Sequence, residues 1–228
     1  MAEIIHLDIC TSTMDEAKRL GRDGAPHGTV VAAKTMTAGR GQHGRAWQAP
    51  PGGLYLSMVL RDVANPRLAT LAIGNAVCDA LEVAGIEAQV KWVNDILVDG
   101  QKIAGILAEG EATGDTLDFI IVGVGLNIRT APDDVAATSM DACLGAPQCI
   151  EDMEMLVVEH IHRWLHRLRD APTEVISAWE NRHQMVGARV AVEDGPAGII
   201  IGIDPSGDLL LDVNGTLTPV NTGSITRI

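Results

Sequence analysis

The sequence contains few basic residues and no long apolar segment. It has 17 Lys and Arg against 30 Asp and Glu, a formal net charge of −13. Nucleic acids and anionic membranes are bound through Lys and Arg side chains, so this balance argues against both as partners. No apolar run approaches the roughly 20 residues that a helix needs to cross a bilayer. We therefore expect a protein that binds neither nucleic acid nor membrane.

Paired cysteines and a secretory leader are also lacking. The four cysteines (Cys10, Cys78, Cys143 and Cys149) form no CxxC pair and have no His at zinc spacing, so we interpret them as buried free thiols. The N-terminal residues MAEIIHLDICTST contain no basic region followed by a cleavage site, which favours a cytoplasmic location. A hydrophobic content of 46% over 228 residues predicts one substantial core with a small appendage.

Hydrophobic periodicity predicts an α+β fold, with a central mixed or antiparallel sheet and helices against one face. Strands are expected at Ile4–Ile9, Thr29–Lys34, Leu54–Leu60, Gln89–Trp92, Ile96–Val98, Lys102–Glu109 and Leu117–Gly123. Helices are expected from a Ser12 or Thr13 cap to about Gly21, from Asn65-Pro66 to Ala84, and at Glu151–Leu168 and Thr173–Met185. Asp15 and Glu16 after the first cap suggest a capping box, and Asp99-Gly100 suggests a tight hairpin turn.

The pattern changes after Gly187 to short alternating strands that are broken by Gly, Pro and Asn. This change predicts a small all-β barrel or meander at the C-terminus. We therefore expect two domains, at residues 1–186 and 187–228.

The segment Thr37–Trp47, TAGRGQHGRAW, has the glycine spacing of a dinucleotide-binding turn. That turn requires a helix after its last glycine, and the following RAWQAPPGG cannot form one, so this interpretation fails. No Asp or Glu occurs from Gly24 to Arg61, which indicates that this region meets an anion. Arg40 and Arg45 suit phosphate or carboxylate oxygens, and Trp47 suits a purine face. A mobile surface loop with solvated arginines remains the alternative.

Two further segments place polar residues where buried strands end. Val90–Glu109, VKWVNDILVDGQKIAGILAE, carries Lys91, Asn94, Asp95 and Lys102 around a hairpin. Charged side chains among apolar strands are costly to bury unless they are paired or serve a site. The third segment, GVGLNI, ends a buried strand in glycines and an asparagine, which suits close backbone approach to a flat ligand.

Together the three segments resemble biotin–protein ligases of the short type without a DNA-binding domain. The family pattern is a Gly-Arg-Gly-x-x-Gly-Arg-x-Trp loop, Lys-Trp-Pro-Asn-Asp running into Lys-x-x-Gly-Ile-Leu, and a Gly-x-Gly-x-Asn strand end. These motifs occur here in order, and STMDEA and ATSM also match. The chain departs from the pattern at three positions: it has Val93 where the family has proline, Met14 where asparagine is common, and Met36 where glutamine is common.

The resemblance implies a catalytic domain like that of class II aminoacyl-tRNA synthetases, followed by an SH3-like barrel. It implies that biotin and ATP, with Mg²⁺, form biotinyl-5′-AMP, and that a lysine of a biotin carboxyl carrier domain then takes the biotin. A homodimer is expected. The barrel either completes the ATP site or docks the carrier.

The same resemblance implies roles for individual residues. It implies that Lys102, Arg40 and Asp95 are catalytic and that Asp95 also binds Mg²⁺. The alternative for Lys102 is a plain surface lysine, and the alternative for Asp95 is a structural turn residue. The biotin-binding set is Ser12, Thr13, Met36, Gly39, Arg40, Gly41, Lys102, Gly105 and Gly123. The adenylate-binding set is Arg40, Arg45, Trp47, Lys91, Asn94, Lys102 and Asn127. For Trp47 the alternative is a residue that only anchors the loop.

Two rival functions remain open. One is a lipoate or octanoate ligase on the same fold, against which the C-terminal barrel and the Lys-Trp-x-Asn-Asp segment weigh. The other is a non-enzymatic sensor of biotinyl-AMP.

Overall fold

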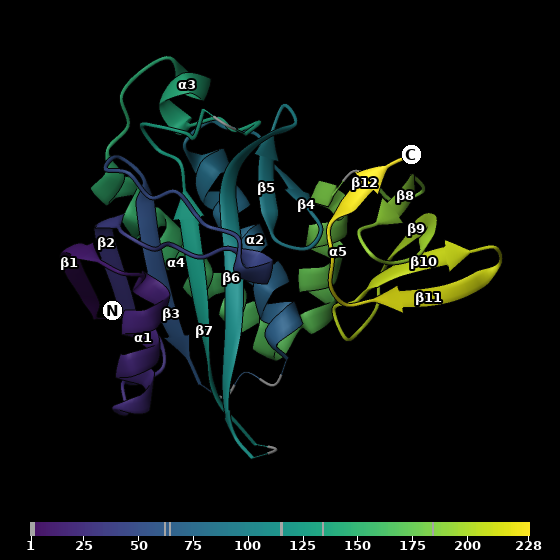
Figure 1. Cartoon of the computed structure of the whole chain (residues 1–228), viewed down its shortest axis with the longest axis horizontal. Coiled ribbons are helices and arrows are strands. Elements are labelled where there is room, and N and C mark those ends of the chain that lie inside the picture. The colour runs from purple at the N-terminus through teal and green to yellow at the C-terminus, as the bar shows by residue number, and fades with distance from the viewer. Residues whose placement is uncertain (1–2, 62, 64, 115, 134, 184) are drawn as a thin grey trace.

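The computed structural model describes residues 3–61, 63, 65–114, 116–133, 135–183 and 185–228. A seven-stranded sheet forms its centre in the order β1-β2-β3-β7-β6-β5-β4 (Figure 1). Its strands are β1 (Ile4–Cys10), β2 (Val30–Met36), β3 (Leu54–Leu60), β4 (Gln89–Lys91), β5 (Asp95–Val98), β6 (Gln101–Thr113) and β7 (Thr116–Leu126). Strands β1 and β2 are parallel and the other neighbours are antiparallel, so the predicted mixed sheet is confirmed.

The helices in the described ranges are α1 (Thr13–Arg22), α2 (Pro66–Val83), α3 (Met140–Leu144), α4 (Ile150–Asp170) and α5 (Pro172–His183). Helix α2 begins as predicted, because the Asn65 side chain accepts the N–H groups of Arg67 and Leu68 and Pro66 opens the helix. The sequence did not predict α3, a five-residue helix. A single short turn gives too few residues for a periodic signal.

Helices cover both faces of the central sheet, which corrects the expectation of one covered face. Helices α2, α4 and α5 pack on one face, and α1 packs on the other through Met14 and Ala17. Alternate β3 and β7 residues serve the two sides: Met58 faces the α2 side, and Val59 and Ile121 face α1. Strands that are buried on both faces consist of consecutive apolar residues, as β3 does. This pattern could have predicted that helices cover both faces of the sheet.

The segment between β4 and β6 differs in part from the prediction. Residues 92–94 form a turn with a cis peptide between Trp92 and Val93, whereas Trp92 was expected to end the strand that begins at Gln89. The predicted Asp99-Gly100 turn is present, and both residues have positive φ angles, 49° and 77°. Strands β6 and β7 are longer than predicted. Strand β6 continues past Glu109 to Thr113, and β7 begins at Thr116 and continues past Gly123 to Leu126.

The cysteines are free, as expected, but they are not all buried. Cys78 lies in the core, where burial raises the pKa of its thiol to about 12. Cys143 and Cys149 are exposed and Cys10 is only partly buried, which corrects the expectation for these three cysteines.

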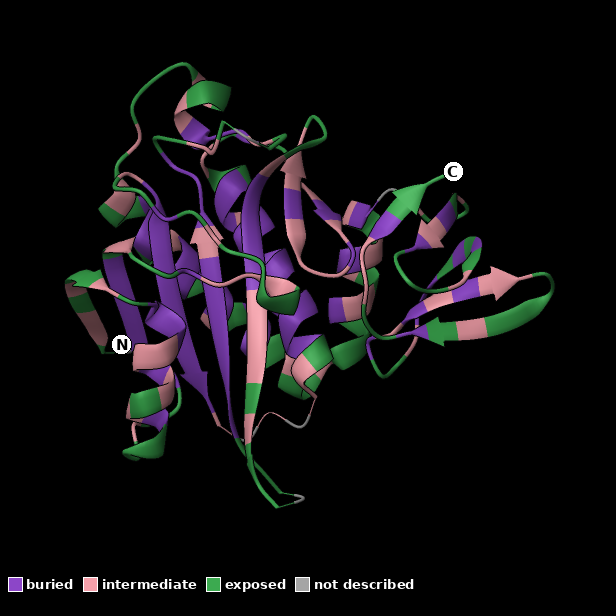
Figure 2. Cartoon of the chain, in the orientation of Figure 1, coloured by how far each residue is buried: buried purple, intermediate pink, exposed green. Residues whose placement is uncertain are grey.

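A second, antiparallel sheet follows α5, in the order β11-β10-β9-β8-β12. Its strands are β8 (Arg189–Val192), β9 (Ala197–Ile203), β10 (Leu209–Val213), β11 (Thr216–Val220) and β12 (Ile225–Arg227). It is joined to the helices by polar contacts: the Ile203 amide donates to Glu180 at 2.7 Å, and Arg67 pairs with Asp208 at 3.2 Å. Buried residues concentrate in the central sheet and the helices behind it (Figure 2). Among the described helices, none is long and apolar enough to cross a membrane.

Candidate active site

A cavity of about 460 Å³ opens beside α1, on the α1 face of the central sheet. Its floor is formed by three glycines, Gly105 on β6 and Gly123 and Gly125 on β7, which have no side chains to fill the space above the sheet. A methyl group added at Gly125 would lie 2.5 Å from Cε2 of Trp47, and one added at Gly105 would lie 2.8 Å from Cζ3 of the same ring. One added at Gly123 would lie 2.7 Å from Sδ of Met14. The strand backbones are therefore bare at the point where the cavity forms.

The segment from Gly39 to Trp47 is a small hairpin beside this floor. Arg40 and Ala46 form a β-bridge, and the Gly41 amide donates to the Arg45 carbonyl at 2.7 Å. The Trp47 amide donates to the Gly39 carbonyl at 2.9 Å, which closes the base of the hairpin. Trp47 thus anchors the loop by lying on the glycine floor, and its ring also lines the cavity.

The cations of the acid-free segment divide into two groups. Arg40 and Arg45 line the cavity, as the sequence predicted. Arg61 instead donates to the Gly21 and Ala25 carbonyls at the end of α1. Lys34 is largely exposed and pairs with Asp8 at 2.7 Å. These two cations have structural partners away from the cavity.

Lys102 and Asp95 form an ion pair on the cavity wall, with Nζ and Oδ1 2.5 Å apart. The lysine comes from β6 and the aspartate from the neighbouring strand β5, so the pair is held by a strand ladder. The Lys102 ammonium also lies 5.2 Å from the centroid of the Trp47 ring. A lysine fixed between a carboxylate and an indole is not a freely solvated surface lysine.

Hydroxyl groups and a thioether form the end of the cavity next to α1. Ser12 caps α1 by accepting the Met14 amide, which confirms the predicted cap. Ser57 donates to the Thr13 hydroxyl at 2.8 Å. The Thr13 amide donates to the Met36 sulfur at 3.3 Å. Met36 is therefore the acceptor for a Thr13 donor that would otherwise face the cavity.

The remaining predicted residues are placed as follows. Asn94 and Asn127 line the cavity, but their amide groups are already engaged, with the Ile106 carbonyl at 2.9 Å and the Thr138 carbonyl at 3.0 Å. Gly41 lines the cavity as well. Gly39 supports Trp47 from the hairpin base, and neither Gly39 nor Lys91 is among the residues that line the cavity.

Two carboxylates beside Arg40 were not predicted as part of the site. Asp15, expected to contribute to a capping box, instead accepts from Arg40 at 2.7 Å. Glu109 lies 3.7 Å from the other terminal nitrogen of Arg40. No local sequence signal joins the three, because they come from α1, the glycine hairpin and β6. The cavity is also lined by Ala137, the first residue of the ATSM motif, and by three residues before it, Pro132, Val135 and Ala136.

Among the described residues that line the cavity, Asp95 is the one carboxylate that could bind a metal ion. The described residues contain no cluster of three or more His, Cys, Asp or Glu side chains that could hold a metal by themselves. Mg²⁺ in nucleotide enzymes is typically bound by one or two carboxylates together with the phosphates. Asp95 therefore fits an ion that arrives with the nucleotide.

Comparisons with known proteins show which family the chain belongs to. A profile of the biotin/lipoate A/B protein ligase family matches residues 7–127, more than half of the chain. The chain belongs to the biotin/lipoate A/B protein ligase family. The matched region includes α1, the glycine hairpin, the Lys102–Asp95 pair and Asn127.

Individual members of the family are similar over most of the chain. The biotin–[acetyl-CoA-carboxylase] ligase of Mycobacterium tuberculosis is 35% identical over 88% of this chain and 79% of its own length. The bifunctional ligase/repressor BirA of Bacillus subtilis is 32% identical over 97% of this chain and 73% of its own length. A solved structure of the biotin protein ligase from Aquifex aeolicus with biotin and ATP is 26% identical, with a TM-score of 0.86, over 100% of this chain and 99% of that one.

Proposed function

We propose that this chain is a biotin–protein ligase that joins biotin to a lysine of a biotin carboxyl carrier domain at the expense of ATP. The observation that carries the proposal is the position of Lys102, whose ammonium lies between Asp95 and Trp47 above the glycine floor. The family and the names of its similar members support biotin as the acid.

In the first half-reaction a carboxylate oxygen of biotin attacks the α-phosphorus of ATP. Biotinyl-5′-AMP forms and pyrophosphate leaves. The two reactants are anions, so positive charge must lie where they meet. Lys102 and Arg40 both line the cavity and supply this charge. The hydroxyl end at Ser12 and Thr13 binds the polar ring of biotin.

In the second half-reaction the carrier lysine attacks the acyl carbon of the adenylate. An amide forms and AMP leaves. The carboxylate of Asp95 orients the incoming amine and accepts its proton. Trp47 packs against the adenine, and Asn127 offers its amide oxygen, since the amide nitrogen already donates to Thr138. Arg45 and the hairpin cover the adenylate and exclude water.

We propose that Mg²⁺ accompanies ATP, held by its phosphates and Asp95. When bound, the ion neutralises phosphate charge that would repel the attacking carboxylate. Asp95 is already paired with Lys102, so the two cations would share this carboxylate.

The test is mass spectrometry of an isolated carrier domain after incubation with this protein, ATP, Mg²⁺ and either biotin or lipoate. We expect the mass increase of one biotinyl group, and no lipoyl group. A lipoyl adduct without a biotinyl adduct would identify a lipoate ligase. Tight binding of biotinyl-AMP with neither adduct nor pyrophosphate release would identify a sensor.

One observation keeps a lipoate or octanoate ligase as the second candidate. Met36 lies at the hydroxyl end of the cavity, where it accepts from Thr13, and Met14 covers Gly123. A thioether is a weaker acceptor than an amide oxygen, and this end is accordingly less polar than a glutamine would make it.

We further propose two domains, at residues 1–186 and 187–228, with the second sheet forming an SH3-like barrel. In support, Arg45 of the hairpin lies 3.4 Å from the hydroxyl of Ser224, the residue before β12, so this C-terminal part of the chain reaches the glycine hairpin. We propose a homodimer formed through the central sheet, of which β1 is an edge strand. A monomer mass in light scattering at micromolar concentration would contradict the dimer.

Location and partners follow from the substrates. We place the reaction in the cytoplasm, where ATP is available, with the carrier domain of a biotin-dependent carboxylase as the protein substrate. The repressor activity named for the Bacillus subtilis relative is not part of the proposal. A net charge of −13 disfavours a phosphate backbone as partner.

A further inference from the structure

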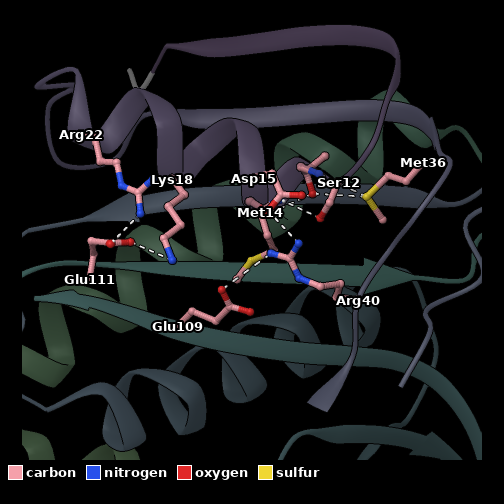
Figure 3. A network of polar contacts seen from close by, with 11 residues as sticks. Ser12, Met14, Asp15, Lys18, Arg22, Met36, Arg40, Glu109 and Glu111 are labelled. Atoms are coloured by element: carbon pink, nitrogen blue, oxygen red, sulfur yellow. Dashed lines mark hydrogen bonds and ion pairs between the residues drawn. The ribbon is translucent and has the colours of Figure 1, made fainter. Parts of the chain in front are cut away.

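One arginine of the glycine hairpin is joined to two other elements of the site. Arg40 donates from Nη1 to Oδ1 of Asp15 in the first turn of α1, at 2.7 Å. Its Nη2 lies 3.7 Å from Oε2 of Glu109 on β6. Figure 3 shows the guanidinium between these carboxylates, beside Met14 and Ser12. Three elements that line the cavity therefore meet at one side chain.

The neighbouring charges on the same surface form a separate group. Glu111 lies two residues beyond Glu109 on β6 and pairs with Lys18 at 2.8 Å and with Arg22 at 2.7 Å (Figure 3). Lys18 and Arg22 belong to α1 and do not line the cavity. The two glutamates thus project from one strand toward α1, and Glu109 takes the hairpin arginine while Glu111 takes cations of the helix.

An arginine on a glycine-rich hairpin needs such partners to have a defined position. A free Arg side chain loses roughly 2 kcal/mol of rotamer entropy when it is fixed, and the hairpin backbone around Arg40 adds its own freedom. The hairpin is also held by the Trp47 ring on the glycine floor, by the contact of Arg45 with Ser224, and at its start by the Ala38 amide, which donates to the Thr11 carbonyl at 2.9 Å. Without the carboxylates, the Arg40 guanidinium would lose both of the ion pairs that hold it.

The two carboxylates leave some N–H donors of the Arg40 guanidinium free for a ligand. An Arg side chain has five N–H donors in a planar fork, and two carboxylate contacts leave donors for a ligand anion. Arg40 lines the cavity while it makes both contacts. The pairs are part-exposed, so they restrain the side chain by a modest free energy and do not lock it.

We propose that Asp15 and Glu109 are positioning residues for the ligase reaction. They hold the Arg40 guanidinium at the cavity wall and thereby tie the glycine hairpin to α1 and β6. Neither carboxylate touches the reacting atoms; each acts through Arg40. The inference rests on the proposed function for its catalytic consequence, but the restraint on the hairpin exists without any ligand.

The chain offers a matched control for each substitution. Asp15→Asn removes a charge from the first turn of α1, and Glu16→Gln removes another from the same turn, where Glu16 pairs with Arg19 and not with the hairpin. Glu109→Gln is matched by Glu111→Gln on the same strand. Any general effect on helix or strand stability should appear equally in the controls.

The first measurement is limited proteolysis of the hairpin without ligands. We expect cleavage in the 39–47 segment to be about threefold to tenfold faster in Asp15→Asn than in Glu16→Gln, the range for losing one charged hydrogen bond. Glu109→Gln should give a smaller increase, because its contact is longer, and the double variant a larger one. Asp15→Glu keeps the carboxylate and should restore most of the protection.

The second measurement is pyrophosphate release as a function of biotin and ATP concentration. The two positioning variants should raise the KM for biotin by about threefold to tenfold with a smaller change in kcat, while the controls match the parent protein. Cleavage and KM equal to those of the controls, or a lower KM in Asp15→Asn, would overturn the inference. A parent protein that releases no pyrophosphate with biotin would refute the proposed function, and the cleavage comparison would still decide the restraint.

Discussion

The two cationic regions of the cavity are built in different ways. Lys102 stands on a β6 position that is paired with β5, and its carboxylate partner comes from that neighbouring strand. Arg40 stands on a hairpin of nine residues, and its partners come from two other elements. The lysine is therefore preorganised by the sheet, whereas the arginine depends on side-chain contacts. This difference indicates that Lys102 supplies fixed charge for the chemical step and that the hairpin supplies a cover that can move.

Removing the fixed charge should have the largest effect. We expect Lys102→Ala to lower the rate of adenylate formation by about 10²–10³, because one preorganised contact to the crowded α-phosphate is lost. Pyrophosphate release measures the rate, and circular dichroism checks that the fold is intact. Lys34→Ala, which removes an exposed lysine away from the cavity, serves as the control. Near-normal release by Lys102→Ala would remove the distinction between the two regions.

The mobility of the cover is tested by protease protection. If cleavage of the hairpin requires the ligand-free form, biotin and ATP together at about 100 times their dissociation constants should slow it about 100-fold. Limited proteolysis followed by mass spectrometry locates the cuts in residues 39–47. Cleavage that is unchanged by the ligands would mean that the hairpin is only a connection between β2 and β3.

The floor under the cover is tested with a single methyl group. Gly125→Ala would place Cβ 2.5 Å from Trp47, so the indole must leave its position. Overpacking of this kind costs about 2 kcal/mol, and we expect biotin binding to weaken roughly thirtyfold in calorimetry. Gly74→Ala in α2, where the added methyl group would have contacts of 3.7 Å, should bind normally. Equal affinities would show that Trp47 does not need the floor.

The smallest expected effect concerns the hydroxyl end. Met36→Gln should tighten biotin binding by no more than about tenfold, the ~1.4 kcal/mol of one net hydrogen bond, because Thr13 already has an acceptor in Met36. Titration calorimetry measures the change. A much larger gain, or faster turnover of lipoate or octanoate than of biotin by the parent protein, would mean that the acid is misassigned.

The sequence predicted the elements of the central sheet and most of the cavity, because both have local signals. Apolar alternation marks the strands, Asn65-Pro66 marks the start of α2, and the glycine hairpin and Lys102 lie in recognisable motifs. Contacts between distant segments had no such signal. The pairing of Arg40 with Asp15 and Glu109 requires α1 to pack on the second face of the sheet, where no helix was expected from the sequence.

The burial of the tryptophans has an optical consequence. The chain has four tryptophans, one tyrosine and one phenylalanine, so its ultraviolet emission comes almost entirely from indole. Trp92, Trp164 and Trp179 are only 2–3% exposed in the core. Trp47 alone among the four lines the cavity, and its Nε1 has no hydrogen-bond partner among the residues that the structure describes. We therefore expect a ligand that enters the cavity to change the emission of this one tryptophan, so that the unmodified protein carries its own fluorescent reporter of occupancy.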